Sequence, residues 1–109
     1  MSYKVKSIAV FEKQAKRLIK KYASLKNELL ELVKELKENP EYGTPIGKNC
    51  FKIRIAIASK GKGKSGGARV ITNFMVADAN VYLLSIYDKL EKENITNTEL
   101  DELLKYIPA

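Results

Sequence analysis

Basic side chains, which are the groups best suited to bind and polarise phosphate, are concentrated in one third of this 109-residue chain. Residues 42–77 contain seven Lys and Arg side chains and no Asp or Glu, whereas the remaining residues contain thirteen of each sign. The formal net charge of +7 therefore arises from this segment. A positive field of that density favours a polyanionic partner, and RNA is the first candidate. The seven residues are Lys48, Lys52, Arg54, Lys60, Lys62, Lys64 and Arg69.

The spacing of these residues predicts that several of them share one face of a β-sheet. Alternating patterns over residues 51–58, 68–76 and 81–87 predict three strands of an antiparallel meander. If the apolar positions of each strand face the core, the alternate positions gather on the other face. That arrangement brings five candidate site residues to one surface: Lys52, Arg54, Arg69, Tyr87 and Lys89.

This shared face has two interpretations. Charged residues are common on the open face of a half-covered antiparallel sheet, and this reading needs no ligand. Converging cations without a carboxylate partner repel one another, however, and a bound phosphate would relieve that repulsion. The presence of Tyr87 beside four cations favours a phosphate-binding site.

The composition excludes several kinds of chemistry. The chain contains no histidine and one cysteine, Cys50, so we expect no disulfide, no metal centre and no cofactor. A Ser-His-Asp hydrolase and a histidine-based nuclease are excluded, and acid–base work falls to Lys, Tyr or a carboxylate. No apolar segment approaches the roughly 20 residues of a membrane span, so we expect no membrane association and a cytoplasmic location.

The segment rich in glycine and lysine that follows the first predicted strand of the meander requires a separate interpretation. Gly61 to Ser65 looks like the end of a nucleotide-binding P-loop, but a β-type run follows where that motif needs a helix. The chain is also too short for the parallel sheet of such a fold, so nucleotide hydrolysis is rejected. We instead predict a turning hairpin tip whose lysines follow an RNA backbone: Lys60, Lys62 and Lys64.

The remaining elements provide the framework for this surface. A short strand over residues 3–6 is followed by two amphipathic helices, capped by Ser7 and Ser24, that form an antiparallel hairpin. The first helix has a basic outer face that includes Lys16 and Lys20. Residues 42–49 are predicted to be a loop, because glycine and proline recur there. A capping box of Thr96 and Glu99 predicts a final helix.

The predicted fold is therefore α+β, with an N-terminal helix hairpin packed on a small, mainly antiparallel twisted sheet and with a C-terminal helix. A chain of 109 residues is sufficient for one modest core, so residues 1–109 are predicted to form a single domain.

The order of these features resembles the RelE superfamily of toxins and, within it, the HigB-like branch. The most specific segments are FKIR at 51–54, GKGKSGGAR at 61–69 and IYDKLEKENI at 86–95, and the resemblance covers nearly the whole chain. It implies a RelE-like fold and the toxin of a type II toxin–antitoxin system. Such a toxin cuts messenger RNA on the ribosome. The implied partners are a cognate antitoxin, the ribosome and mRNA, with a monomer when free and a hetero-oligomer with the antitoxin.

The resemblance also implies roles for individual residues. Lys52 and Arg54 match a basic pair on the sheet, Arg69 the central arginine, and Tyr87 with Lys89 the C-terminal catalytic positions. The implied reaction is metal-independent attack of a 2'-OH on the adjacent phosphate, with Arg69 at the phosphate oxygens. Crowding by Arg54 and Arg69 would lower the pKa of Lys52 and fit it to be the base, with Tyr87 as the competing candidate. Residues expected to bind RNA are Lys16, Lys20, Lys60, Lys62, Lys64 and Lys92.

Two alternatives from other functional classes stay open at this stage. The related ParE proteins share the architecture but inhibit DNA gyrase by binding it, and a binder needs no convergence of basic groups with a tyrosine. The third reading is a simple RNA-binding module, for which few aromatic residues are available to stack on bases.

Overall fold

The computed structural model describes residues 3–61, 63 and 66–108. In these residues the elements follow the order β1 (Lys4–Ser7), α1 (Ala9–Lys21), α2 (Leu25–Glu38), β2 (Thr44–Gly47), β3 (Cys50–Ile55), the 3-10 turn η1 (Ala58–Lys60), β4 (Ala68–Met75), the 3-10 turn η3 (Val76–Asp78), β5 (Asn80–Asp88) and α3 (Asn97–Leu104). The fold is α+β, as the sequence predicted.

The described strands form one sheet in the order β1-β5-β4-β3-β2. The predicted meander of three strands is confirmed, because β3, β4 and β5 pair antiparallel in sequence order. The short N-terminal strand is also confirmed, as β1, and it pairs parallel to β5. The parallel pair is possible because the two helices that follow β1 carry the chain across the sheet.

One segment differs from its prediction. Residues 42–49 were predicted to be a loop, but Thr44–Gly47 forms the edge strand β2 beside β3. The prediction was wrong because Pro45 and Gly47 obscure the strand pattern, although proline is tolerated at a sheet edge where its missing N–H is not needed.

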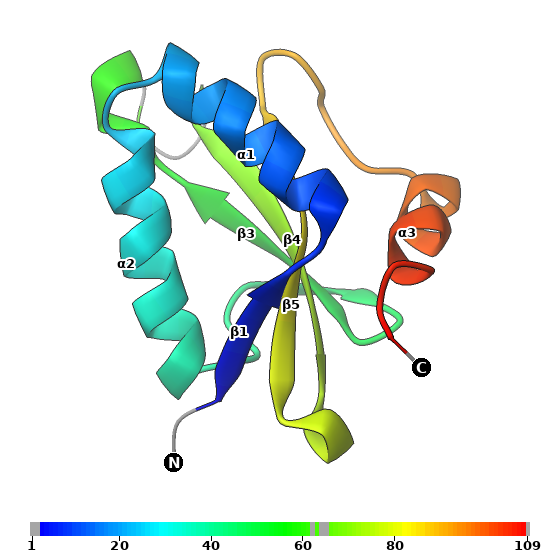
Figure 1. The fold of residues 1–109 in the computed structure, drawn as a ribbon. Coiled ribbons are helices and arrows are strands. Elements are labelled where there is room, and N and C mark those ends of the chain that lie inside the picture. The colour runs from blue at the N-terminus through cyan, green and yellow to red at the C-terminus, as the bar shows by residue number, and fades with distance from the viewer. Residues whose placement is uncertain (1–2, 62, 64–65, 109) are drawn as a thin grey trace.

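The helices are placed by their apolar stripes. Buried side chains of α1 and α2 join those of the sheet in one core; they include Phe11, Ala15 and Leu18 from α1, Leu25, Leu32 and Leu36 from α2, and Ile53, Val70 and Ile86 from the strands. Figure 1 shows α2 and α3 on opposite sides of the sheet, with α1 packed across β5. Within the described residues, no helix has the length and apolar character needed to cross a membrane.

The predicted helix caps are confirmed in full for α3 and in position alone for α2, whereas the prediction for α1 is wrong. Thr96 and Glu99 form the predicted capping box of α3, with hydrogen bonds of 3.1 and 3.0 Å to each other's backbone N–H. Ser7 is not the cap of α1, which begins after Ile8, and its hydroxyl donates instead to Glu12 at 2.6 Å. Ser24 is the N-cap residue of α2, as predicted, but its side chain makes no capping hydrogen bond; its Oγ accepts from the Ser59 N–H.

The face of the sheet that carries Lys52 is covered more extensively than the sequence indicated. Leu100 and Leu103 of α3 are buried, and Ile71, which points to the same face as Lys52, is fully buried. The residues between β5 and α3 therefore cross over the surface on which the candidate site lies (Figure 1).

Candidate functional site

Three of the five candidate residues lie in one row across the sheet. Arg54 of β3 pairs with Arg69 of β4, and Arg69 pairs with Tyr87 of β5. Residues directly opposite each other on antiparallel strands point to the same face, so the three side chains form a continuous polar row. We call Arg54, Arg69 and Tyr87 the cross-strand row. The sequence predicted that these residues share a face, and the strand register confirms it.

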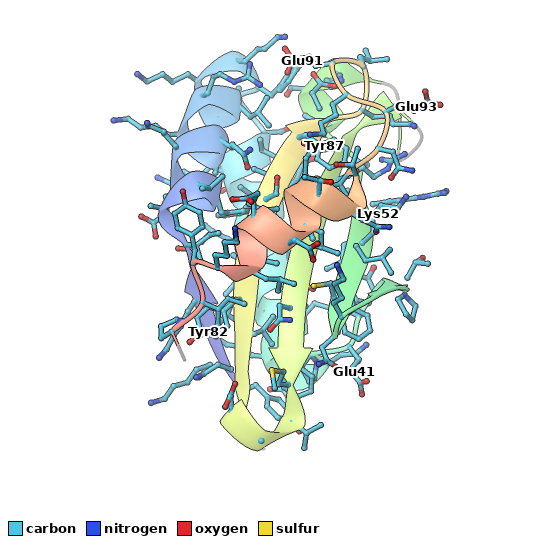
Figure 2. All side chains as sticks on the ribbon, turned by 90° about the vertical axis from the view of Figure 1, so that its right-hand side faces the viewer. Glu41, Lys52, Tyr82, Tyr87, Glu91 and Glu93 are labelled. Atoms are coloured by element: carbon cyan, nitrogen blue, oxygen red, sulfur yellow. The ribbon has the colours of Figure 1, made fainter. Side chains whose placement is uncertain are left out.

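The two candidate lysines flank this row on opposite sides. Lys52 lies two residues before Arg54 on β3 and pairs with Ile71, whereas Lys89 follows β5 at the other end, where its N–H donates to the Gly67 carbonyl at 3.0 Å. Two residues along a strand correspond to about 7 Å, so each lysine is one pleat away from the row. Figure 2 views the molecule from the α3 side and shows Tyr87 and Lys52 near the beginning of that helix.

Gly67 allows β3 and β4 to approach each other beside the row. A Cβ at this position would lie 1.9 Å from the carbonyl oxygen of Ile55, a separation that no side chain can occupy. Glycine is therefore required here for close backbone approach and not for a turn, which is the role that the sequence interpretation had assigned to the glycines of this segment.

The cross-strand row is mostly closed to solvent. Arg54 is exposed, but Arg69 and Tyr87 are only 4% and 6% exposed. Residues of the segment between β5 and α3 contact the two lysines that flank the row. Lys52 Nζ donates to Asn94 Oδ1 at 3.4 Å, and Lys89 Nζ donates to the Glu93 carbonyl at 3.2 Å.

Burial determines the electrostatics of the row. It lowers the pKa of the Arg69 guanidinium from its ordinary value, and the neighbouring charge of Arg54 lowers that pKa further. Burial raises the pKa of the Tyr87 phenol, although the charge of Arg69 opposes this effect. The Tyr87 hydroxyl is also buried without a hydrogen-bond partner among the described residues. The row thus contains a crowded guanidinium beside a neutral phenol that has a proton to donate.

Comparison with known proteins identifies the family of this chain. Residues 6–107 match the family described as RelE toxin of RelE / RelB toxin-antitoxin system. The chain belongs to this family. A solved structure of a double arginine-to-alanine mutant of E. coli toxin RelE, in the free state, is similar to this chain with a TM-score of 0.60. The match covers 99% of this chain and 100% of that chain at 18% sequence identity, and it supports the RelE fold.

Membership of the RelE family makes this chain the toxin of a toxin–antitoxin system, for which a RelB-type antitoxin is the implied partner. Its closer relation to the HigB-like branch stays a prediction. Across the described residues, no group of three His, Cys, Asp or Glu side chains could hold a metal ion.

Other predicted RNA-binding residues of this RelE-family chain occupy different places. Lys92 lies beside the row, with its Nζ 5.8 Å from the centre of the Tyr87 ring, and forms an ion pair with Glu99. Lys16 and Lys20 are exposed on α1, away from the row, and line a shallow depression together with Lys13, Arg17 and Lys21. Lys62 and Lys64 lie outside the described residues.

Lys60 is not where the sequence interpretation placed it. Its side chain is 5% exposed, and its ammonium lies 2.7 Å from the carboxylate of Asp88. Lys60 therefore has no open face toward a nucleic acid in this structure, and we do not include it in an RNA surface. Lys60 is the last residue of η1, and its side chain reaches Asp88, the last residue of β5.

Sequence reasoning missed the acidic and amide residues that organise this RelE-type site. Asp88 is almost fully buried at the end of β5, and Asn94 contacts Lys52. The sequence offered one usable signal, since a lone aspartate directly after a buried strand needs a partner. The hydrogen bond of Asn94 depends on the path of the chain after β5, which no local pattern determines.

Proposed function

We propose that this toxin is a ribosome-dependent endoribonuclease that cleaves messenger RNA without a metal ion. The observation that carries the proposal is the cross-strand row of Arg54, Arg69 and Tyr87 with a lysine on each side of it. A protein that only binds a partner has no need to bring two guanidiniums and a buried phenol into register. Cleavage of a phosphodiester uses all of these groups.

The proposed reaction balances with the groups present. The ribose 2'-OH loses its proton, its oxygen attacks the adjacent phosphorus, and the bond from phosphorus to the 5'-oxygen breaks. The products are a 2',3'-cyclic phosphate and a 5'-OH that has gained a proton. The protein must therefore accept one proton, stabilise negative charge on the phosphate oxygens and return one proton to the leaving oxygen.

The positions of the side chains support an assignment of these roles. Arg54 and Arg69 are placed to hold the phosphate oxygens, because a guanidinium donates two parallel hydrogen bonds. Because burial raises the pKa of Tyr87, this residue remains a neutral phenol at neutral pH and acts as a proton donor instead of a base. This favours Lys52 over Tyr87 for the role of base.

The lysines on either side of the row fit the geometry of the displacement. The attacking and leaving oxygens lie on opposite sides of the phosphorus in an in-line reaction. Lys52 and Lys89 lie on opposite sides of the row, so a phosphate above the row has one amine near each oxygen. We assign Lys52 to the attacking side as base and Lys89 to the leaving side, where it assists Tyr87.

The burial of Arg69 and Tyr87 supports dependence on the ribosome. We infer that RNA reaches these residues when the segment 89–96 shifts, which breaks the contact of Lys52 with Asn94. A message held by the ribosome is already oriented, so its binding energy is available to open this segment. We place the protein in the cytoplasm, as a monomer when free and as a hetero-oligomer with its antitoxin.

Primer extension on a message in a purified translation system tests this function. We expect cuts at codon-defined positions with the protein and ribosomes present, and none when ribosomes are omitted. Arg69→Ala should abolish the cuts, and Arg69→Gln serves as the second variant because it leaves a smaller cavity. Circular dichroism and antitoxin binding verify that each variant is folded. Cutting by either folded variant would contradict the assignment of Arg69, and inhibition of gyrase without RNA cleavage would replace the proposed function.

A further inference from the structure

Three side chains from distant parts of the chain meet under the end of β5. Asp88 accepts hydrogen bonds from the Tyr22 hydroxyl at 2.5 Å and from Lys60 Nζ at 2.7 Å. Lys60 Nζ also lies 5.0 Å from the centre of the Tyr22 ring, in a cation–π arrangement. We call Tyr22, Lys60 and Asp88 the buried cluster.

The burial of this cluster calls for an explanation other than stability. The Lys60 and Asp88 side chains are only 5% and 1% exposed. Removing two charges from water costs nearly as much as their attraction returns, and apolar replacements of such pairs often stabilise a protein. A buried ion pair is therefore better explained by the geometry that it imposes.

Asp88 imposes geometry on the residues that bear the site. It lies between Tyr87 and Lys89 in the chain. Its Oδ1 accepts from the Leu90 N–H at 3.0 Å, and its carbonyl accepts from the N–H groups of Glu91 and Lys92 at 3.0 Å each. The carboxylate and the backbone of one residue thus define the turn that leaves β5.

Lys60 connects this turn to the glycine-lysine segment. It ends η1, and η1 is held on the beginning of α2 by two further contacts. The Ala58 N–H donates to Glu28 Oε2 at 2.7 Å, and Ser59 and Ser24 are joined by hydrogen bonds of their hydroxyls and backbone. The junction of α1 and α2 therefore holds η1, and the ion pair transmits that position to β5.

We propose that Tyr22, Lys60 and Asp88 are positioning residues that fix Tyr87 and Lys89 relative to Arg69, and that Lys60 acts through Asp88 without contacting RNA. This inference rests on the proposed nuclease function. It replaces the RNA-binding role that the sequence indicated for Lys60 with one inside the protein.

A double variant separates positioning from stability. Lys60→Met and Asp88→Asn each leave one buried polar partner unsatisfied, and both should lower stability and cleavage. The combination Lys60→Met/Asp88→Asn removes the uncompensated charge, so it should regain most of the stability. Its kcat should nevertheless stay about 10-fold to 100-fold below that of the native chain, with KM unchanged, because small misplacements of reacting groups have effects of that size.

The matched control neutralises an exposed ion pair. Lys34 and Glu31 pair at 3.5 Å on α2, with both side chains largely exposed. Lys34→Met/Glu31→Gln should change neither kcat nor the midpoint of urea unfolding. Recovery of both stability and kcat in the Lys60/Asp88 double variant would show that the cluster is only structural. An increase in KM at constant kcat for Lys60→Met would show that Lys60 binds RNA, and either result overturns the proposal.

Hydrogen exchange gives a readout that does not depend on cleavage. The amides of Leu90 and Lys92, which donate to Asp88, should exchange faster in the double variant than in the native chain. If the native chain cleaves no message, the proposed function fails and these amides still test the positioning. If the double variant does not fold, Tyr22→Phe removes one hydrogen bond and should lower kcat several-fold and accelerate exchange at Leu90. Unchanged exchange in the folded variant overturns the inference.

Discussion

Arg54 and Arg69 face each other directly across β3 and β4, so two positive charges occupy one cross-strand pair. Like charges at such a position destabilise a sheet, and here they also contribute to the lowered pKa of Arg69, after burial. A destabilising arrangement at the centre of a candidate site is expected where function has determined the residues.

Replacing Arg54 with glutamine should therefore stabilise the protein and impair cleavage. We expect a gain of about 0.2–1 kcal/mol in the free energy of unfolding, the usual range for a cross-strand pair, because the repulsion with Arg69 is removed. The rate of message cleavage should fall about 10-fold or more, since the phosphate loses one of its hydrogen-bond donors. Urea unfolding and primer extension measure the two effects. Lys26→Gln removes the same charge from the exposed side of α2 and should change neither the free energy of unfolding nor the rate of cleavage.

Tyr87→Phe, like the Arg54 variant, should keep or raise stability while it impairs cleavage. The Tyr87 hydroxyl is buried without a partner among the described residues, so its removal deletes a group that is costly to bury. We expect an equal or higher Tm and a kcat reduced by two orders of magnitude, the usual contribution of a general acid, about 10²-fold. Differential scanning fluorimetry and single-turnover cleavage provide the measurements. Full activity in this variant would leave Lys89 as the donor to the leaving oxygen.

The basic face of α1 should contribute to affinity and not to chemistry. Lys16 and Lys20 are exposed and lie apart from the cross-strand row. Lys16→Gln/Lys20→Gln should weaken binding to ribosomes and reduce the dependence of log Kd on log salt concentration by about 1 for each phosphate that the variant no longer neutralises. The single-turnover rate at saturation should stay unchanged. Lys34→Gln/Lys37→Gln on α2 makes the same change of charge, and an equal effect there would mean that only net charge matters.

The sequence predicted the parts of this fold that local patterns determine. Alternation gave the meander and the shared face of Arg54, Arg69 and Tyr87, because a strand has only two faces and one of them must be buried. The capping box of Thr96 and Glu99 was recognisable for a similar reason, since both partners lie within four residues. These features depend on neighbours in the chain.

The failures at the candidate site have the opposite property, because they depend on distant segments. Lys60 appeared to be one more lysine of a basic loop until the end of β5 placed Asp88 beside it, 28 residues away. The burial of Arg69 likewise depends on the path of the chain after β5, which no periodicity encodes. A single sequence does not show which cation a carboxylate will pair with when the two lie far apart in the chain.

The buried cluster also makes stability depend on pH in a defined direction. Burial alone would raise the pKa of Asp88, but the hydrogen bonds from Lys60, Tyr22 and the Leu90 N–H outweigh it and lower that pKa below its ordinary value. A group whose pKa is depressed by folding stabilises the protein fully above its unfolded pKa, near 4 for aspartate. That contribution is lost as the pH falls through the folded pKa.

Asp88→Asn should therefore lower the free energy of unfolding most at neutral pH and least in acid. At pH 7 we expect a loss of about 3 kcal/mol, the lower end of the range for breaking a buried ion pair, because Lys60 keeps its charge without a carboxylate. As the pH falls below 4, Asp88 is protonated first in the unfolded chain and only at a lower pH in the folded chain, so the difference between native and variant should narrow. Urea unfolding followed by circular dichroism at pH 7, 5, 4 and 3 measures this. Glu102→Gln removes a carboxylate from an exposed pair with Lys105 and should show no such trend, while a constant difference for Asp88→Asn would mean that its carboxylate is not stabilised by the cluster.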